Sequence, residues 1–513
     1  MGKAYIDYME EITEQELYDG LLGHGLFSEN LPPVFSSVEF CDWCKRKKIE
    51  LRDNHPGGYI YYESIRNVNT PRQIGIPNPF AYARLCEGLM TYWDELKKYF
   101  AKKTNGDEYK ISRIHVRKNI DEDTLFKLSH KNHKNYKNKE HDSNLVAEIS
   151  IGKKYMVKSD ISSCFPSIYT HALAWALVGK EKAKEDRDKR DMWFNKLDRF
   201  SRNVKSGETN GLLVGPHASN LLSEIILVGV DAELLKKGYT FIRHIDDYQC
   251  FVKSHEAAEQ FIVDLVMELK RFNLIVNSKK TKVIKLPIPA ETEWVSILSD
   301  IFPEKTKDNV SVRVIKKYLD LAIKFMKDND GDAAPINYAV KVAADLDLKE
   351  DARIYIVDRI LHLVIIYPYL VRLLSEYVFD RYEVSAEKLK TFISFLYKDS
   401  LDRKNYEGIS YALFFSVKYG VEISGFDEAF VSECDCITKV MAYLYCKKYN
   451  KSDGLKRLKK SATDLSKDSY EENWLFIYEI LSSDELKKTD IKRKEEWIRL
   501  KNDNISFIHS EYR

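Results

Sequence analysis

Alternating apolar positions mark the part of the chain between residues 57 and 300. Short runs with this period predict strands at residues 57–62, 70–77, 155–160 and 241–252. In the last of these runs the apolar residues lie on both sides of an adjacent acidic pair, which predicts a hairpin with the acids at its turn. This part of the chain is therefore expected to contain a sheet.

After residue 300 the strand signals stop and the apolar spacing becomes helical. Ile315, Leu319 and Ala322 illustrate the period, and similar stretches follow to residue 513. We therefore predict an α+β fold in three parts: an N-terminal extension (residues 1–56), a mixed region (57–300) and an all-α region (301–513). Helix pairs about 40 residues apart would suit a loose helical solenoid.

The acidic pair at the predicted hairpin turn is Asp246 and Asp247. Neighbouring carboxylates repel each other, so we expect a cationic group against them. An exposed acidic turn without function would show the same pattern. A third acid in a matching position decides between these readings.

This third acid is Asp160, at the end of the strand predicted for residues 155–160. Two such strands paired in one sheet would bring Asp160 and Asp246 together. Clustered carboxylates hold two divalent cations about 4 Å apart, the arrangement that stabilises both oxygens in phosphoryl transfer. We expect two Mg²⁺ ions, with Mn²⁺ as the alternative.

Composition limits the partners and the compartment. The net charge of the 513 residues is +2, so nucleic-acid contact has to come from local basic patches. One such run, residues 113–139, has eight Lys or Arg against three Asp or Glu, and a solvated loop is its other interpretation. Eight scattered cysteines and the lack of a secretory leader favour a cytoplasmic protein. The most apolar window, residues 354–374, carries charges that a bilayer span would not tolerate.

Five motifs in order resemble reverse transcriptases over residues 57–290. They are a fingers-like hairpin at residues 72–77, Asp160 with Phe165, a glycine-containing turn and helix at 211–222, Asp246-Asp247, and a lysine-rich segment at 277–282. Residues 160–171, Trp175, Gly179-Lys180, residues 220–223 and Lys280-Thr-Lys282 are similar to the abortive-infection (Abi) polymerases of the AbiK type, most of all to the short Abi polymerase of P-two-like prophages.

This resemblance implies an architecture and an activity. Its members pair a reverse-transcriptase palm and fingers with a C-terminal HEAT-like helical domain. They make DNA from dNTPs without a template, attach the single-stranded product covalently to the protein, form homo-oligomers, and act in phage defence in the bacterial cytoplasm. A tyrosine hydroxyl is the family's primer.

The resemblance also implies roles for single residues. Asp160 and Asp246 would be metal ligands together with the carbonyl of Ile161, and Asp247 would support the site or act as an outer ligand. The nucleotide-binding positions and their expected roles are Phe165 (stacking beneath the sugar and excluding a 2′-hydroxyl, hence dNTP use), Arg72 (triphosphate clamp), Gly211, Gly215 and Ser219 (pocket wall), and Lys280 or Lys282 (leaving pyrophosphate). A core Phe, a surface Arg and solvated lysines are the corresponding non-functional interpretations.

Two departures concern the template. Template-copying reverse transcriptases carry Pro-Gln before the second glycine of the glycine-containing motif and an aromatic residue two positions before the acidic pair. Here these places hold Leu213-Val214 and His244. The missing Gln removes a group that seats the template base, which agrees with untemplated synthesis.

The priming residue stays open in the sequence. The family's priming tyrosine precedes the fingers, where residues 28–35 of this chain contain none. The candidates are Tyr5, Tyr8, Tyr18, Tyr59, Tyr61 and Tyr62. Two other functions remain alternatives: a conventional RNA-directed DNA polymerase, and a helical-repeat scaffold with an inactive polymerase domain.

Overall fold

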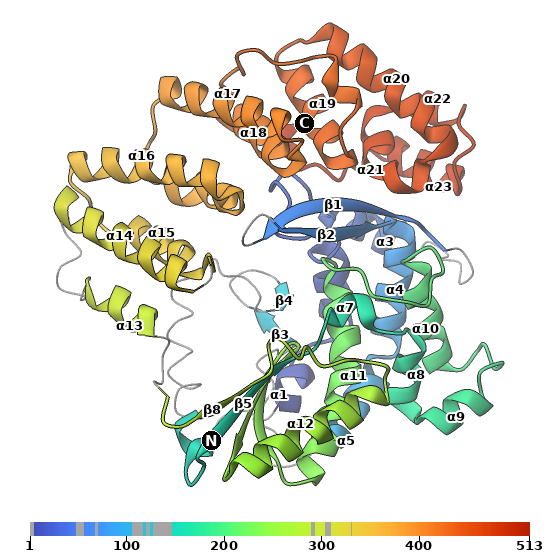
Figure 1. The fold of residues 1–513 in the computed structure, drawn as a ribbon. Helices are drawn as coiled ribbons and strands as arrows, with labels where there is room; N and C mark the ends of the chain where they lie inside the picture. The colour runs from blue at the N-terminus through green and yellow to red at the C-terminus, as the bar shows by residue number, and fades with distance from the viewer. Residues whose placement is uncertain are drawn as a thin grey trace.

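The computed structural model describes nine stretches of the chain. They are residues 5–47, 56–66, 70–104, 116–119, 124–126, 146–288, 293–302, 309–329 and 331–513. A four-stranded sheet with its helices lies at one side, a long two-stranded hairpin lies in the middle, and an arc of helices covers the other side (Figure 1). Apart from β3 (Val116–Asn119) and β4 (Thr124–Phe126), the basic run at residues 113–139 lies outside the described residues.

The sheet has the strand order β6-β7-β5-β8, and all neighbours are antiparallel. The strands are β5 (Tyr155–Asp160), β6 (Thr240–His244), β7 (Asp247–Val252) and β8 (Lys282–Lys285). Alternate residues such as Val157 and Cys250 point into the main core, whereas Met156 and Phe251 form a small cluster on the other face. Both faces of the central strands are therefore covered by apolar contacts.

Helices cover the sheet and continue towards the hairpin. They are α7 (Cys164–Ser167), α8 (His171–Val178), α9 (Lys180–Glu185), α10 (Trp193–Asn203), α11 (His217–Lys236) and α12 (His255–Lys270). Helix α12 packs on β5, β7 and α11. Sixteen of the twenty residues of α11 are buried, so this helix is a central element of the fold.

The hairpin β1 (Tyr59–Arg66) and β2 (Thr70–Pro77) confirms the two strands predicted there. Its second strand leads into α4 (Pro79–Thr91) and α5 (Trp93–Lys103), and Asn78 caps α4 by accepting a hydrogen bond from the Phe80 N–H. The Gly75 N–H donates to the Val214 carbonyl at 2.8 Å. The hairpin thus joins the sheet-bearing part through the segment before α11.

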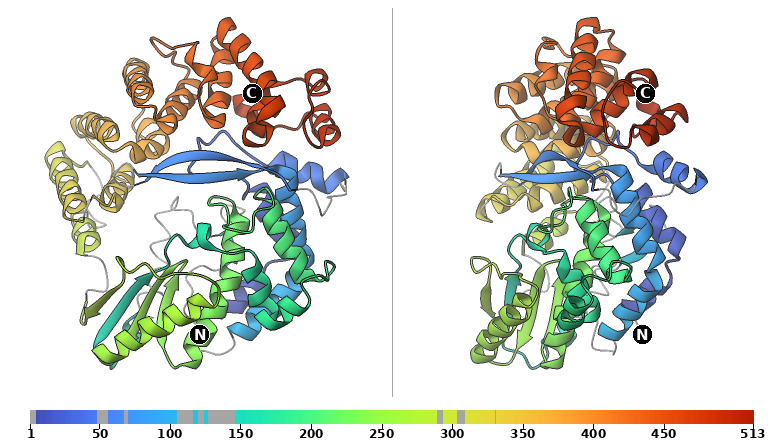
Figure 2. Two further views of the ribbon diagram at one scale, coloured as in Figure 1. Left: turned by 45° about the vertical axis from the view of Figure 1, so that its right-hand side comes forward. Right: turned by 90° about the vertical axis from the view of Figure 1, so that its right-hand side faces the viewer.

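The rest of the described chain is helical, as predicted. The elements are α13 (Glu293–Asp300), α14 (Val312–Asp328), α15 (Ala334–Ala344), α16 (Glu350–Ile366), η4 (Pro368–Leu373), η5 (Ser375–Phe379), α17 (Ala386–Asp402), α18 (Tyr406–Tyr419), η6 (Phe430–Ser432), α19 (Cys436–Lys448), α20 (Ser452–Asp468), α21 (Tyr470–Ile480), α22 (Ser483–Leu486), α23 (Lys494–Asn502) and η7 (Ser510–Tyr512). They form an arc over the hairpin (Figure 2). The α+β class is confirmed, whereas the HEAT-like character and the boundaries at residues 56 and 300 stay predictions.

The N-terminal segment packs into the same core as the rest of the chain. Its elements are α1 (Tyr5–Glu10), α2 (Glu14–Tyr18), η1 (Asp19–Gly23) and α3 (Val38–Lys47). Phe35 pairs with Ile508 in an isolated antiparallel bridge, and the Trp43 indole N–H donates to Asp503 at 2.7 Å. The last helices of the arc are therefore fastened to residues near the start of the chain. Within the described residues, no helix is both long enough and apolar enough to cross a bilayer.

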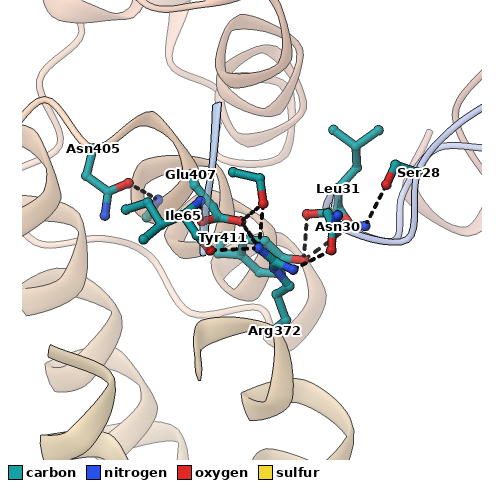
Figure 3. A network of polar contacts seen from close by, with 10 residues as sticks. Ser28, Asn30, Leu31, Ile65, Arg372, Asn405, Glu407 and Tyr411 are labelled. Carbon is teal, nitrogen blue, oxygen red and sulfur yellow. Dashed lines mark hydrogen bonds and ion pairs between the residues drawn. The ribbon is translucent and has the colours of Figure 1, made fainter. Parts of the chain in front are cut away.

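Arg372 joins three separate parts of the structure (Figure 3). Its guanidinium donates to Glu407 of α18 at 3.0 Å, to the carbonyl of Ile65 in β1 at 3.1 Å, and to the side chains of Ser64 and Asn30. The Ile65 N–H donates to Glu407 at 2.7 Å. Burial raises the pKa of Glu407 and Arg372 opposes this shift. The pair fixes the hairpin to the helical region.

We expect Arg372→Met to destabilise the protein by about 2–3 kcal/mol, because it leaves the 1% exposed Glu407 side chain without its counter-charge. The double variant Arg372→Met/Glu407→Met should lose less, since no buried charge remains. Urea denaturation measures both. Lys388→Ala, which removes an exposed ion pair with Asp358, is the control and should change stability by less than about 0.5 kcal/mol. A double variant less stable than Arg372→Met would contradict this account.

Candidate active site

Three acidic residues meet at one end of the sheet. Asp160 is the last residue of β5 and lies directly opposite Asp247, the first residue of β7. Asp246 occupies the two-residue turn between β6 and β7, and its carbonyl accepts a hydrogen bond from the Ile161 N–H at 3.2 Å. Asp160 is buried and the other two are half-buried. The register alone brings the three carboxylates together.

The carboxylates repel each other in a partly dehydrated place. Burial raises the pKa of Asp246 and of Asp247, and the nearby charge of Asp160 raises both further. Three acidic groups therefore share this end of the sheet, where a cation would relieve their repulsion. This arrangement favours the binding of cations.

Lys280 supplies one cation. Its ammonium donates to the Asp160 carboxylate, and this contact raises the lysine pKa. The backbone places Lys280 there: the Asn277 N–H donates to the Asp160 carbonyl at 2.7 Å, and the Lys280 N–H donates to the Asn277 carbonyl at 3.1 Å. Lys282 lies in β8, exposed and opposite Lys158. The structure thus brings Lys280, and not Lys282, to the carboxylates.

The donor set fits a divalent cation. Carboxylate and carbonyl oxygens are the ligands that Mg²⁺ and Mn²⁺ take, and Asp160, Asp246 and the carbonyl of Ile161 would supply them. Among the described residues, no group of three or more His, Cys, Asp or Glu is already arranged as a metal site. The Lys280 ammonium takes a cation's place at Asp160.

A buried ion network holds the acidic turn from behind. Arg243, in β6, is fully buried and contacts Asp231 at 2.7 Å and Glu224 at 2.8 Å, both on α11. It also donates to the carbonyl of Ile245 at 2.9 Å. Ile245 has a φ of +57°, which is costly for a β-branched residue. The Arg243 contact therefore stabilises an unfavourable turn next to Asp246.

Two tyrosine hydroxyls complete this network. Tyr248 donates to Asp231 at 2.9 Å, and Tyr5 donates to Glu224 at 2.6 Å. The sequence named Tyr5 only as a candidate primer and did not predict the network of Arg243, Glu224, Asp231 and Tyr248. A usable signal was present, because Glu224 and Asp231 are seven residues apart, on one side of an otherwise apolar helix.

The glycine-containing segment contacts the hairpin instead of an open pocket. Gly215 has a φ of +126°, and a Cβ there would lie 2.9 Å from Ile74 Cγ2. A Cβ on Gly75 would lie 2.8 Å from Leu213 Cδ2. Ser219 is buried in the first turn of α11. These positions fix two backbones close together, and their contact with a nucleotide stays a prediction.

Phe165 and Arg72 lie in different surroundings. Phe165 is half-buried in α7, and its carbonyl accepts the Leu212 N–H at 2.8 Å, which joins it to the segment before Gly215. Arg72 is exposed and lies opposite Ser64, so both side chains share the face of the hairpin where Ser64 contacts Glu407. The clamp role of Arg72 stays a prediction. His244 is exposed at the end of β6.

The candidate priming tyrosines differ in accessibility. Tyr5, Tyr18 and Tyr62 are buried, and burial raises the pKa of each. Tyr61 is 45% exposed and lies opposite Gly75, on the side of the hairpin that Leu213 approaches. Tyr59 and Tyr8 are half-buried. Accessibility therefore favours the last three over the first three.

Residues 102–312 match the family described as reverse transcriptase (RNA-dependent DNA polymerase). This range includes the three acids and Lys280 but not Arg72. No curated protein sequence is significantly similar to the chain.

Among solved structures, three telomerase chains are similar at low identity. A truncated apo telomerase from Candida tropicalis lacking its C-terminal domain has 12% identity and a TM-score of 0.28, over 49% of this chain and 55% of that one. Apo telomerase from Candida tropicalis has 11% identity and a TM-score of 0.31, over 85% and 72%. Telomerase from Candida albicans with a fragment of telomeric RNA has 11% identity and a TM-score of 0.29, over 85% and 67%. The chain thus spans about half of the first of these.

Arg243→Lys should destabilise the protein by about 3 kcal/mol, because an ammonium cannot serve Glu224, Asp231 and the Ile245 carbonyl at once. Tyr248→Phe should cost only about 1 kcal/mol, the value of one hydrogen bond. Urea denaturation compares them with Arg271→Lys, whose side chain is 56% exposed. Equal small losses for all three would show that the network does not hold the turn.

Asp246→Asn should raise the melting temperature at pH 7.5 in EDTA. The raised pKa of Asp246 means that the folded state binds its proton more tightly than the unfolded chain. This carboxyl therefore favours folding below the unfolded pKa of about 4, and the benefit is lost as pH rises through the folded pKa. The difference from wild type should vanish near pH 4, and scanning calorimetry measures it. Glu259→Gln on the exposed side of α12 is the control. A lower melting temperature for Asp246→Asn at pH 7.5 would refute this.

Proposed function

We propose that this chain makes DNA from dNTPs without a template, in antiviral abortive infection. The premise is that it carries a reverse-transcriptase domain and is a nucleotidyltransferase of the reverse-transcriptase-like class. A protein hydroxyl would prime the synthesis, so that the product stays covalently attached. The observation that carries the proposal is the register of Asp160 opposite Asp247, with Asp246 in the adjoining turn.

The residues around the acids suit nucleotidyl transfer. Bound Mg²⁺ would lower the pKa of the attacking hydroxyl and neutralise charge on the phosphates. Asp160, Asp246 and the Ile161 carbonyl would hold it, and Asp247 would keep the site acidic. Lys280, already at Asp160, would neutralise or protonate the leaving pyrophosphate. Phe165 would select the deoxyribose, and Arg72, Gly215, Ser219 and Lys282 would serve the rest of the nucleotide.

Packing of the segment before α11 supports untemplated synthesis. Leu213 packs against Gly75, and the Val214 carbonyl accepts a hydrogen bond from the Gly75 N–H. Neither side chain has an amide with which to seat a template base. An accessible tyrosine hydroxyl would act as primer. Tyr61 lies opposite Gly75, beside this segment, and Tyr59 and Tyr8 are the other accessible candidates. We also propose a homo-oligomer in the bacterial cytoplasm, as the resemblance implies.

Incubation of the purified protein with Mg²⁺ and labelled dNTPs, without primer or template, tests the proposal. Label should remain on the protein after denaturation, and Asp246→Asn should lower it at least about 100-fold, since even groups that only orient metal ligands cost 10–100-fold. Glu259→Gln should leave it unchanged. Tyr61→Phe, Tyr59→Phe and Tyr8→Phe, followed by mass spectrometry of the tyrosine peptides, identify the primer.

Other outcomes select other functions. Label that appears only with an added primer and RNA template would establish a conventional reverse transcriptase, the activity for which the matching family is named. No incorporation under either condition, with equal phage protection by wild type and Asp246→Asn in plaque assays, would favour an inactive scaffold.

A further inference from the structure

A cavity of about 570 Å³ lies between α8, α9 and α10, and none of the three acids of the candidate active site lines it. Five cationic side chains line it against a single carboxylate, that of Asp198. Lys184, Arg187 and Arg190 are exposed, whereas Arg199 and Arg202 are half-buried. Its volume falls in the range of small-molecule sites, and the excess of positive charge favours an anionic ligand.

The exposed cations are weakly compensated. Arg187 approaches the exposed Asp188 only at 3.6 Å, and no ion pair of Lys184 or Arg190 is found in the described part of the chain. Lys189, by contrast, pairs with Asp186 at 2.7 Å, and the Asn195 amide donates to the carbonyls of Asp186 and Lys189. The loop that presents Arg187 and Arg190 is therefore held in place while these cations face solvent.

The single carboxylate gives the cavity a second kind of contact. Asp198 is 4% exposed, and one of its oxygens lies 2.7 Å from His171 Nδ1. Arg202 Nε is 3.6 Å from the same oxygen, which is too long for a hydrogen bond. The other oxygen, Oδ1, is buried and accepts no hydrogen bond from any described residue. A buried acceptor of this kind needs a donor, such as a sugar hydroxyl or a base amino group.

Aromatic rings complete the lining. Tyr169 and Trp175 lie with ring centroids 5.6 Å apart, and Lys180 places its ammonium 4.3 Å from the centre of the Trp175 ring. Aromatic faces beside cationic side chains are typical of sites that hold a nucleobase and its phosphates. Phosphate contacts alone would not require the rings or the buried carboxylate.

We propose that this cavity is a second nucleotide-binding site, separate from the carboxylate centre. The phosphates of a nucleotide contact Lys184, Arg187 and Arg190, its sugar or base donates to Asp198, and the base lies against Tyr169 and Trp175. A free nucleoside triphosphate and the 5′-phosphorylated end of a DNA strand share this chemistry. Binding there needs no metal ion, unlike nucleotide binding at the carboxylates.

The cavity is connected to the candidate active site through backbone contacts. Tyr169 forms an isolated bridge with Asn210, and the Gly211 N–H donates to the Ile168 carbonyl at 2.8 Å. The segment from Phe165 to Tyr169 therefore lies between the two sites. A nucleotide in the cavity would restrain the same segment that positions Phe165.

Isothermal titration of the full chain in EDTA tests the proposal, because chelation suppresses binding at the carboxylates and prevents synthesis. The probes are dATP, a 5′-phosphorylated oligo(dT) and tripolyphosphate. The triple variant Lys184→Gln/Arg187→Gln/Arg190→Gln should weaken dATP or oligonucleotide binding at least about tenfold. Lys182→Gln, on the same helix as Lys184, exposed and outside the lining, is the matched control and should change the affinity less than about twofold.

Three results would overturn the proposal: no binding of either nucleotide probe, equal loss in the triple variant and in Lys182→Gln, or tripolyphosphate bound as tightly as dATP. Tighter binding of dATP than of the oligonucleotide identifies free nucleotide as the source, and the reverse identifies DNA. All four substitutions in these two variants alter exposed side chains, so unchanged thermal melting separates lost binding from lost folding.

Discussion

Arg243 is fully buried between Glu224 and Asp231, and the position of the acidic turn depends on this contact. The guanidinium needs two counter-charges and also reaches the Ile245 carbonyl, so one side chain links α11 to the turn that carries Asp246. A buried charge of this kind is expensive unless it is fully paired. The paired Arg243 therefore holds the turn of Ile245 and Asp246 in one position against α11.

The same logic applies at the hairpin β1–β2. On one edge of the hairpin, the Gly75 N–H donates to the Val214 carbonyl. On the other edge, the Ile65 N–H donates to Glu407, whose charge is balanced by Arg372. In each case a charge placed inside the fold prescribes one arrangement, because no alternative packing satisfies it. The hairpin is therefore held along both of its edges.

Local patterns were sufficient for β1, β2, β5, β6 and β7, for the helical region and for the meeting of Asp160 with Asp246, since acids at strand ends meet when the strands pair. They did not predict β3, β4 or β8. Lys280 and Lys282 were indistinguishable in the sequence because they are two residues apart. The turn at Asn277 and the hydrogen bond between Ser159 and Thr281 separate them, and both depend on distant residues. Arg243 looked like an ordinary strand residue, since its partners lie on another element. The contact of Gly215 with Ile74 was hidden for the same reason.

The helical region is attached to the rest of the protein at both ends. It follows β8 in the chain, and near its other end Ile508 pairs with Phe35 and the backbone bonds to residues 34–36. A helical region attached at both ends has less freedom to rotate than one attached at a single end. A strand made at the carboxylates would therefore pass a helical region that is attached to the rest of the protein at two places rather than one.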